Sequence, residues 1–152
     1  MEEKVRVIIV GDGEDRGKLV SMALLSGLQK YLFFEGKQYG TDLIKAYKSA
    51  HCFILPSVFE GQPLTILEAS AAKLPIICTD VGENKAMFKE GFAGWIVEPR
   101  SSAELAEAML AAMNAKDLKR KGNQNYKHVQ DYTWKKMAEK TEEVYNRVRA
   151  NY

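Results

Sequence analysis

Two glutamates, Glu60 and Glu68, stand eight positions apart, and the seven residues between them carry no charge. Glu68 lies inside an uncharged run with the composition of a helix. An ionised carboxylate in such a run costs free energy unless a partner compensates for its lost hydration. The pair is therefore a candidate for binding a polar ligand through hydrogen bonds.

The segment between the glutamates has the features of a loop that enters a helix. Gly61 gives the loop freedom, and Pro63 suits the first turn of a helix over 63–73. The free N–H groups of a helix start bind phosphate well, and Thr65 adds a hydroxyl beside Leu64. A diphosphate at this helix start, with a sugar on either side, would use both carboxylates.

Two structural explanations compete with this ligand site. Glu60 would also be favourable as a negative charge near the helix dipole. Glu68 would also be satisfied by an ion pair with Lys45 or Lys73. Asp80 is equally suited to a site at a strand end and to capping the helix that follows.

Other chemistries find little support. Gly11 and Gly13 are followed by Arg16 where a dinucleotide-binding loop needs glycine, and there is no Gly-Lys-Ser/Thr for a phosphate-binding loop. His51 and His128 lie too far apart in sequence to suggest a ligand pair. We find no spacing typical of a metal site and no nucleophile triad.

Short apolar runs alternate with helical patterns along the chain. The runs predict strands, and the first, third and fourth are nearly continuous, as in strands covered on both faces. Together they predict an α/β fold, a Rossmann-like three-layer sandwich with a parallel sheet of about five strands and helices on both faces. The expected strands are 5–10, 31–35, 52–55, 75–78 and 95–97, and the expected helices are 15–29, 42–50, 63–73, 83–90, the segment 104–113 that follows Ser101, 117–131 and 133–149.

Helix starts and stripes refine this prediction. Thr41 is expected to cap the helix over 42–50, and Ser101 with Glu104 forms a capping box. The final segment, 133–150, predicts an amphipathic helix. Trp95 and Trp134 are expected in the core.

Ligands of open parallel sheets bind beyond the carboxyl ends of the strands. Gly11, Gly36, the segment 56–61 and the segment 79–82 follow the first four predicted strands. These small and polar residues are what a ligand cleft needs, although ordinary turns between strands and helices have the same composition.

Length and charge narrow the class of protein. The 152 residues suit one domain, or part of a larger protein, and the net charge of +2 gives no argument for nucleic acid binding. No apolar run approaches the length of a membrane span. Glu2, Glu3 and Lys4 leave no apolar leader at the start, and two cysteines indicate free thiols, so we expect a cytoplasmic protein.

The segments 11–13, 33–36 and 54–84 resemble the nucleotide-sugar-binding domain of retaining glycosyltransferases of group 1 (family 4), whose fold is called GT-B. The resemblance implies that Glu60 binds hydroxyls of the donor sugar at the reacting centre and that Glu68 binds the ribose. It implies further that backbone around the helix start meets the diphosphate and that two glycines line the cleft. The residues concerned are Gly61, Leu64 and Thr65 for the diphosphate, Gly36 near the base, and Gly11 in the cleft.

The resemblance covers the second half of a GT-B enzyme only. It implies a partner, the N-terminal acceptor domain or a separate acceptor subunit, and a nucleotide diphosphate sugar as donor substrate with no metal or other cofactor. The Arg and Lys that the family uses to neutralise the diphosphate have no clear counterpart, although Arg16 and Lys85 are substitutes to consider. We therefore expect weak nucleotide binding and little or no transfer by this chain alone.

Three alternatives stay open. A sugar-nucleotide 2-epimerase and a glycan phosphorylase share the architecture, but the residues that each would need are not evident. A non-catalytic module that pairs with a separate subunit is the third, and its exposed interdomain face would favour self-association. For the full-length protein, a place at the membrane surface is a further expectation. The base, the sugar and the acceptor are not specified by the sequence.

Overall fold

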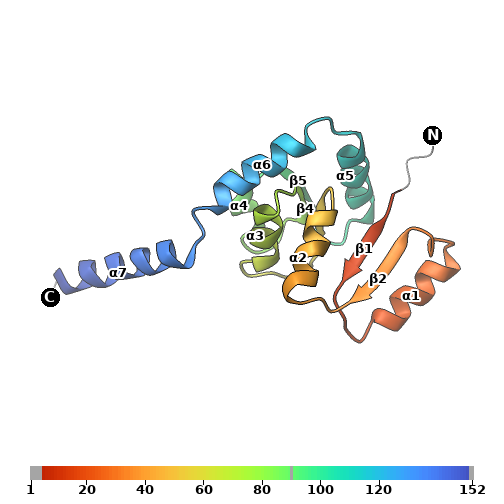
Figure 1. Ribbon diagram of the computed structural model, residues 1–152, viewed down its shortest axis with the longest axis horizontal. Helices are drawn as coiled ribbons and strands as arrows, with labels where there is room; N and C mark the ends of the chain where they lie inside the picture. Colours follow the sequence, from red (N-terminus) through yellow and green to blue (C-terminus); the bar gives the residue numbers. More distant parts are fainter. Residues whose placement is uncertain (1–4, 90, 151–152) are drawn as a thin grey trace. The chain divides into compact units, whose positions relative to one another are not determined.

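The computed structural model describes residues 5–89 and 91–150 (Figure 1). The chain divides into two units, Met1–Ala46 and Tyr47–Tyr152, which are described separately. The expected leader-free start at Glu2, Glu3 and Lys4, and the last residue of the helix predicted over 83–90, lie outside the described residues.

Unit 1 contains a pair of parallel strands. Strand β1 (Val7–Val10) pairs with β2 (Leu32–Gly36), and helix α1 (Arg16–Leu25) connects them. The register places Val7 beside Leu32 and shifts before Val10, which lies opposite Gly36. Half-buried and exposed side chains alternate along β1. Helix α2 (Gly40–Ser49) begins in this unit and ends in the next.

Unit 2 contains a three-stranded parallel sheet in the order β3-β4-β5. The register aligns Leu55 of β3 with Cys78 of β4 and Ile96 of β5. Its elements are β3 (Phe53–Leu55), α3 (Leu64–Ala71), β4 (Ile76–Thr79), α4 (Asn84–Lys89), β5 (Gly94–Val97), α5 (Ser102–Asn114), α6 (Leu118–Val129) and α7 (Trp134–Ala150).

The predicted α/β class, the five strands and their parallel direction are confirmed. The grouping differs from one continuous sheet, because backbone hydrogen bonds join the strands as sheets of two and three. These two sheets belong to the two separate units.

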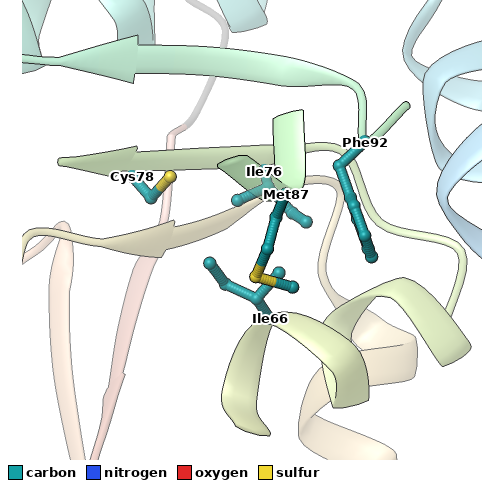
Figure 2. Packing of buried hydrophobic residues seen from close by; sticks show 5 residues of the cluster. All are labelled: Ile66, Ile76, Cys78, Met87 and Phe92. Atoms are coloured by element: carbon teal, nitrogen blue, oxygen red, sulfur yellow. The ribbon is translucent and has the colours of Figure 1, made fainter. Parts of the chain in front are cut away.

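Strand β4 organises the core of unit 2, since all four of its residues are buried. Ile76 and Cys78 pack with Ile66 of α3 and Met87 of α4, and Figure 2 shows the sulfur end of Met87 next to Ile66. Ile77 lies in a second cluster with three further residues. That cluster is completed by Val97 of β5 and by Ala108 and Ala112 of α5. Alternate side chains of β4 therefore serve opposite faces of the sheet, and helices cover both.

The helix starts agree only in part with the sequence. The Glu104 N–H donates to Ser101 Oγ at 3.3 Å, as the capping box predicts, but the Glu104 carboxylate accepts from the Glu98 N–H at 2.9 Å. The prediction that Thr41 caps α2 is wrong. The helix begins at Gly40, so Thr41 lies inside its first turn. Gly40 has a φ of 52°, a left-handed conformation that glycine adopts without strain.

Candidate functional site

A serine in the loop that follows β3 donates a hydrogen bond to the carboxylate of Glu60. Ser57 Oγ donates to Glu60 Oε1 at 2.7 Å. The backbone carbonyl of Ser57 in turn accepts from Thr79 Oγ1 at 2.6 Å, at the end of β4. Glu60 is half-buried, and its loop is fixed to the carboxyl edge of the sheet.

The loop that follows β4 lies directly against the Glu60 backbone. Gly82 has a φ of 53°, and a Cβ atom there would lie 2.0 Å from the carbonyl oxygen of Glu60. The Glu83 N–H donates to the carbonyl oxygen of Gly61 at 3.1 Å. The sequence placed Gly82 among the small residues at the sheet edge, but the close approach is visible only in three dimensions.

Asn84 holds the loop that follows β4 in place from the protein interior. The side chain is fully buried, and Nδ2 donates to the carbonyl oxygen of Thr79 at 2.9 Å. Its Oδ1 is buried without a hydrogen-bond partner among the described residues. Asn84 thereby fixes the end of β4, from which Thr79 reaches the Glu60 loop.

Asp80 and Lys85 form an ion pair at 2.5 Å. The Asp80 carboxylate therefore pairs with a side chain of α4 instead of capping that helix, and its place in a ligand site at the end of β4 stays a prediction. The hydrogen bond from Lys85 and the charge of Asp80 raise the pKa of the lysine. Lys85 is thus paired with Asp80 at the surface of unit 2.

Helix α3 begins at Leu64 with no side chain capping it. Pro63 occupies the N-cap position in an extended conformation, and the Ile66 N–H donates to its carbonyl oxygen at 3.2 Å. Leu64 is 63% exposed and Thr65 is half-buried. The start of α3 at Leu64 and Thr65 is therefore accessible, as an anion site needs.

Glu68 lies one turn into α3 and is paired with a tyrosine. The Tyr47 hydroxyl donates to Glu68 Oε2 at 2.9 Å, and the Tyr47 ring lies 5.7 Å from that of Phe53. Burial raises the pKa of Tyr47 well above its usual value, and the hydrogen bond and charge of Glu68 raise it further. The phenol is therefore a neutral donor at ordinary pH.

The predicted ion pair of Glu68 with Lys73 is not found among the described residues of unit 2, and Lys45 has a partner within unit 1. Lys45 pairs with Asp42 at 2.8 Å, and Lys73 lies over the ring of Tyr126, 4.8 Å from its centroid. Each lysine thus contacts another side chain of its own unit, and the observed partner of Glu68 is the Tyr47 hydroxyl.

The two glycines predicted to line the cleft lie together in unit 1. The Gly11 N–H donates to the carbonyl oxygen of Gly36 at 2.8 Å, and both glycines have positive φ values. Gly11 follows β1 and Gly36 is the last residue of β2, so both lie at the carboxyl ends of that strand pair. Arg16 donates to the carbonyl oxygen of Phe34 at 3.4 Å nearby.

A cavity of about 750 Å³ lies elsewhere in unit 2, along α6 and beside Gly91. It contains no residue of the predicted site. Gly91 precedes β5, whereas Glu60 and Gly82 follow β3 and β4. The cavity therefore belongs to the amino edge of the sheet. Its lining is Gly91, Lys119, Arg120, Asn123, Gln124, Lys127, His128 and Asp131.

The described residues include no group of three or more His, Cys, Asp or Glu side chains that could hold a metal ion. None of the helices in the described ranges is long and apolar enough to cross a membrane. The carboxyl edge of the sheet in unit 2 carries two carboxylates, hydroxyl donors and the N–H groups of a helix start. This set can bind hydroxyls and phosphate together.

Comparison with known proteins identifies the family. The profile described as "Glycosyl transferases group 1" matches residues 1–129. A D-inositol 3-phosphate glycosyltransferase of Nocardia farcinica is 28% identical over 148 residues, which cover 93% of this chain and 33% of that protein. An Escherichia coli UDP-Gal:alpha-D-GlcNAc-diphosphoundecaprenol alpha-1,3-galactosyltransferase is 32% identical over 112 residues, 73% of this chain and 28% of that protein. The chain thus spans about a third of the length of these relatives.

Solved structures agree on the fold. A sucrose-phosphate synthase of Thermosynechococcus elongatus matches 98% of this chain and 39% of its own, with a TM-score of 0.79 and 21% identity. The C-terminal domain of a glycosyl transferase group 1 family protein of Francisella tularensis matches 82% of this chain and 68% of its own, with a TM-score of 0.70 and 23% identity. From the profile match together with this fold, the chain belongs to the glycosyl transferases group 1 family.

Proposed function

We propose that this chain is the donor-binding domain of a glycosyltransferase that moves a sugar from a nucleotide diphosphate sugar to an acceptor hydroxyl. The observation that carries the proposal is the placement of two carboxylates around the uncapped start of α3. A ligand with hydroxyls on both sides of a diphosphate matches this order of groups. The fold shared with the C-terminal domain of a glycosyl transferase group 1 family protein supports a place in the C-terminal half of such an enzyme.

Each group has a distinct role in the proposal. Glu68 accepts hydrogen bonds from the ribose hydroxyls. The backbone N–H groups around Gly61, Leu64 and Thr65 bind the diphosphate, with the positive end of the α3 dipole behind them. Glu60 binds hydroxyls of the donor sugar and orients its anomeric carbon. Gly11 and Gly36 let backbone approach the nucleotide, the latter near the base.

The reaction breaks the bond between the anomeric carbon and the β-phosphate oxygen. A bond from the acceptor oxygen to the same carbon replaces it with retained configuration, the acceptor proton leaves, and a nucleoside diphosphate is released. The negative charge that develops on the diphosphate is stabilised by the amides of the α3 start. The donor is a substrate, and the proposal requires no metal or further cofactor.

Transfer needs parts beyond those in this chain. Lys85 pairs with Asp80, and we propose that further cations for the diphosphate come from other parts of the enzyme. The chain spans about a third of the length of its relatives. We propose that the rest of the enzyme provides the acceptor domain. The isolated chain should accordingly bind nucleotide weakly and transfer little or no sugar.

Calorimetric titration tests the proposal. UDP, GDP and ADP are compared with UDP-glucose, GDP-mannose and ADP-glucose on the wild-type chain, Glu60→Ala, Glu68→Ala and the control Glu107→Ala. Glu107 is an exposed glutamate of α5. Loss of charge-assisted hydrogen bonds should weaken nucleotide binding about 10- to 100-fold in Glu68→Ala. Glu60→Ala should remove only the additional affinity of the sugar nucleotide.

Two outcomes would contradict the proposed donor site. If no nucleotide binds the wild-type chain at millimolar concentration, and the chain instead associates tightly with itself or another subunit, the donor-site proposal is wrong. The chain would then be an association module. Equal weakening by the Glu107→Ala control would also count against the proposed site.

A further inference from the structure

We propose that Tyr47 and Ser57 are positioning residues, whose hydroxyls fix the carboxylates of Glu68 and Glu60 for their ligand. The inference rests on the proposed function, because it concerns how the two glutamates meet a donor. It adds two residues that touch the carboxylates, and it assigns each of them a different part of the donor.

The Tyr47 hydroxyl reaches Glu68 from another helix. The residues are separated by 21 positions, and the oxygen atoms are 2.9 Å apart. Tyr47 is half-buried on α2 with its ring against Phe53 of β3, so packing limits the positions of the phenol. Because Glu68 itself is exposed, the tyrosine is what restricts its otherwise mobile side chain.

Ser57 acts on Glu60 through a backbone that is itself anchored. Asn84 donates to the carbonyl oxygen of Thr79, and Thr79 Oγ1 donates to the carbonyl oxygen of Ser57. Ser57 Oγ then donates to Glu60 Oε1 at 2.7 Å. The orientation of the Glu60 carboxylate therefore depends on a chain of hydrogen bonds that starts at a fully buried amide.

Both partners are neutral hydroxyl donors rather than cations. A lysine or arginine would balance the charge of each carboxylate and compete for its lone pairs. A hydroxyl occupies one position on one oxygen and leaves the negative charge in place. Among the described residues, Glu60 Oε2 and Glu68 Oε1 have no protein hydrogen-bond partner, so both oxygens are available to ligand hydroxyls.

The experiment separates the two positioning roles. Tyr47→Phe keeps the ring, and Ser57→Ala keeps the loop backbone, while each removes one hydroxyl. The wild-type chain and both variants are titrated by calorimetry with UDP, GDP and ADP and with UDP-glucose, GDP-mannose and ADP-glucose. Tyr145→Phe and Ser102→Ala, on exposed faces of α7 and α5, are the matched controls. Thermal unfolding of each variant is followed by circular dichroism.

We expect a split between the variants. Tyr47→Phe should weaken the binding of nucleotides and of sugar nucleotides alike, by about 3- to 10-fold, as the loss of one net hydrogen bond predicts. Ser57→Ala should weaken the binding of sugar nucleotides only, by a similar factor. In a Glu68→Gln background, Tyr47→Phe should cause less additional loss than in the wild type, because the two side chains act as one unit.

Failure of this inference is distinguishable from failure of the proposed function. If Glu68→Ala loses binding and Tyr47→Phe does not, the positioning role of Tyr47 is wrong and the donor site stands. If Ser57→Ala weakens nucleotides as much as sugar nucleotides, the serine is merely structural. If the wild-type chain binds no nucleotide, the proposed function and this inference fall together.

Discussion

Gly82 and Glu60 approach so closely that only a hydrogen fits between them. A Cβ atom at position 82 would lie 2.0 Å from the Glu60 carbonyl oxygen and 2.8 Å from that of Gly61. The φ of 53° at Gly82 is also one that side chains other than glycine rarely adopt. The carboxylate loop therefore owes its position to the absence of a side chain on the neighbouring loop.

Replacing this glycine should damage stability and site together. We expect Gly82→Ala to lower the free energy of unfolding by about 2–4 kcal/mol, through backbone strain and displacement of the Glu60 loop. Gly61→Ala, with open space around the added Cβ atom, should change it by less than about 1 kcal/mol. Urea denaturation compares the two, and equal losses would contradict the close-approach argument.

Asn125 should be a large contributor to the stability of unit 2. The buried amide accepts from the Ala93 N–H at 2.5 Å and donates to the carbonyl oxygens of Leu74 and Ala93. Asn125→Ala leaves these backbone groups without their partner, so we expect a loss of about 2–4 kcal/mol in unfolding free energy. Asn123→Ala, at an exposed position of the same helix, serves as the control and should cost less than about 0.5 kcal/mol.

The two cysteines should be unreactive in the folded chain near neutral pH. Burial raises the pKa of Cys52 to about 12, and burial with the charge of Asp80 raises that of Cys78 to about 12. Since the thiolate is the reactive form, a disulfide reagent at pH 8 should label the native chain slowly and the urea-unfolded chain at both thiols. Rapid labelling of two thiols in the native state would show that they are not protected.

The same cysteines give stability a dependence on alkaline pH. Their folded pKa lies above the ordinary value of 9.0, so the folded state holds the protons more tightly than the unfolded state. This contribution is complete below about pH 9 and disappears as the pH rises toward about 12. Alanine at both positions should flatten the decline in the midpoint of urea unfolding over that interval, although other groups that titrate there will keep part of it.

Helix α7 should contribute little to the stability of the rest of unit 2. None of its residues is buried, whereas Tyr132 just before it packs against Phe92. A chain that ends at Thr133 should therefore keep its unfolding free energy within about 0.5 kcal/mol. Tyr132→Ala should cost about 1–3 kcal/mol by the same denaturation measurement, because a packed aromatic ring is removed.

Local patterns in the sequence predicted the elements well. The apolar run that became β4 and the Ser101 cap of α5 were found because each depends on residues close together in the chain. Trp134 shows the limit of such reasoning. It was expected in the core but is 89% exposed, since hydrophobicity alone does not say whether a helix has a surface to pack against.

The candidate site was predictable in its residues and not in its connections. The spacing of Glu60 and Glu68 and the start of α3 follow from the sequence. The partner of Glu68 does not, because Tyr47 lies 21 positions away and competes with two lysines that are equally plausible in one dimension. Outside the site, the structural role of Asn125 was not predicted for the same reason, as its backbone partners lie 32 and 51 positions away.

The alternation of side chains along β4 has an evolutionary consequence. Ile76 and Ile77 are neighbours in the chain, yet one packs with α3 and α4 and the other with α5. A change of volume at position 76 should select for compensation at Ile66 or Met87, and a change at position 77 for compensation at Ala108 or Ala112. The packing on each face of the sheet can thus change in sequence almost independently of the other face. The carboxyl edge that carries Glu60 can be conserved while either face is repacked.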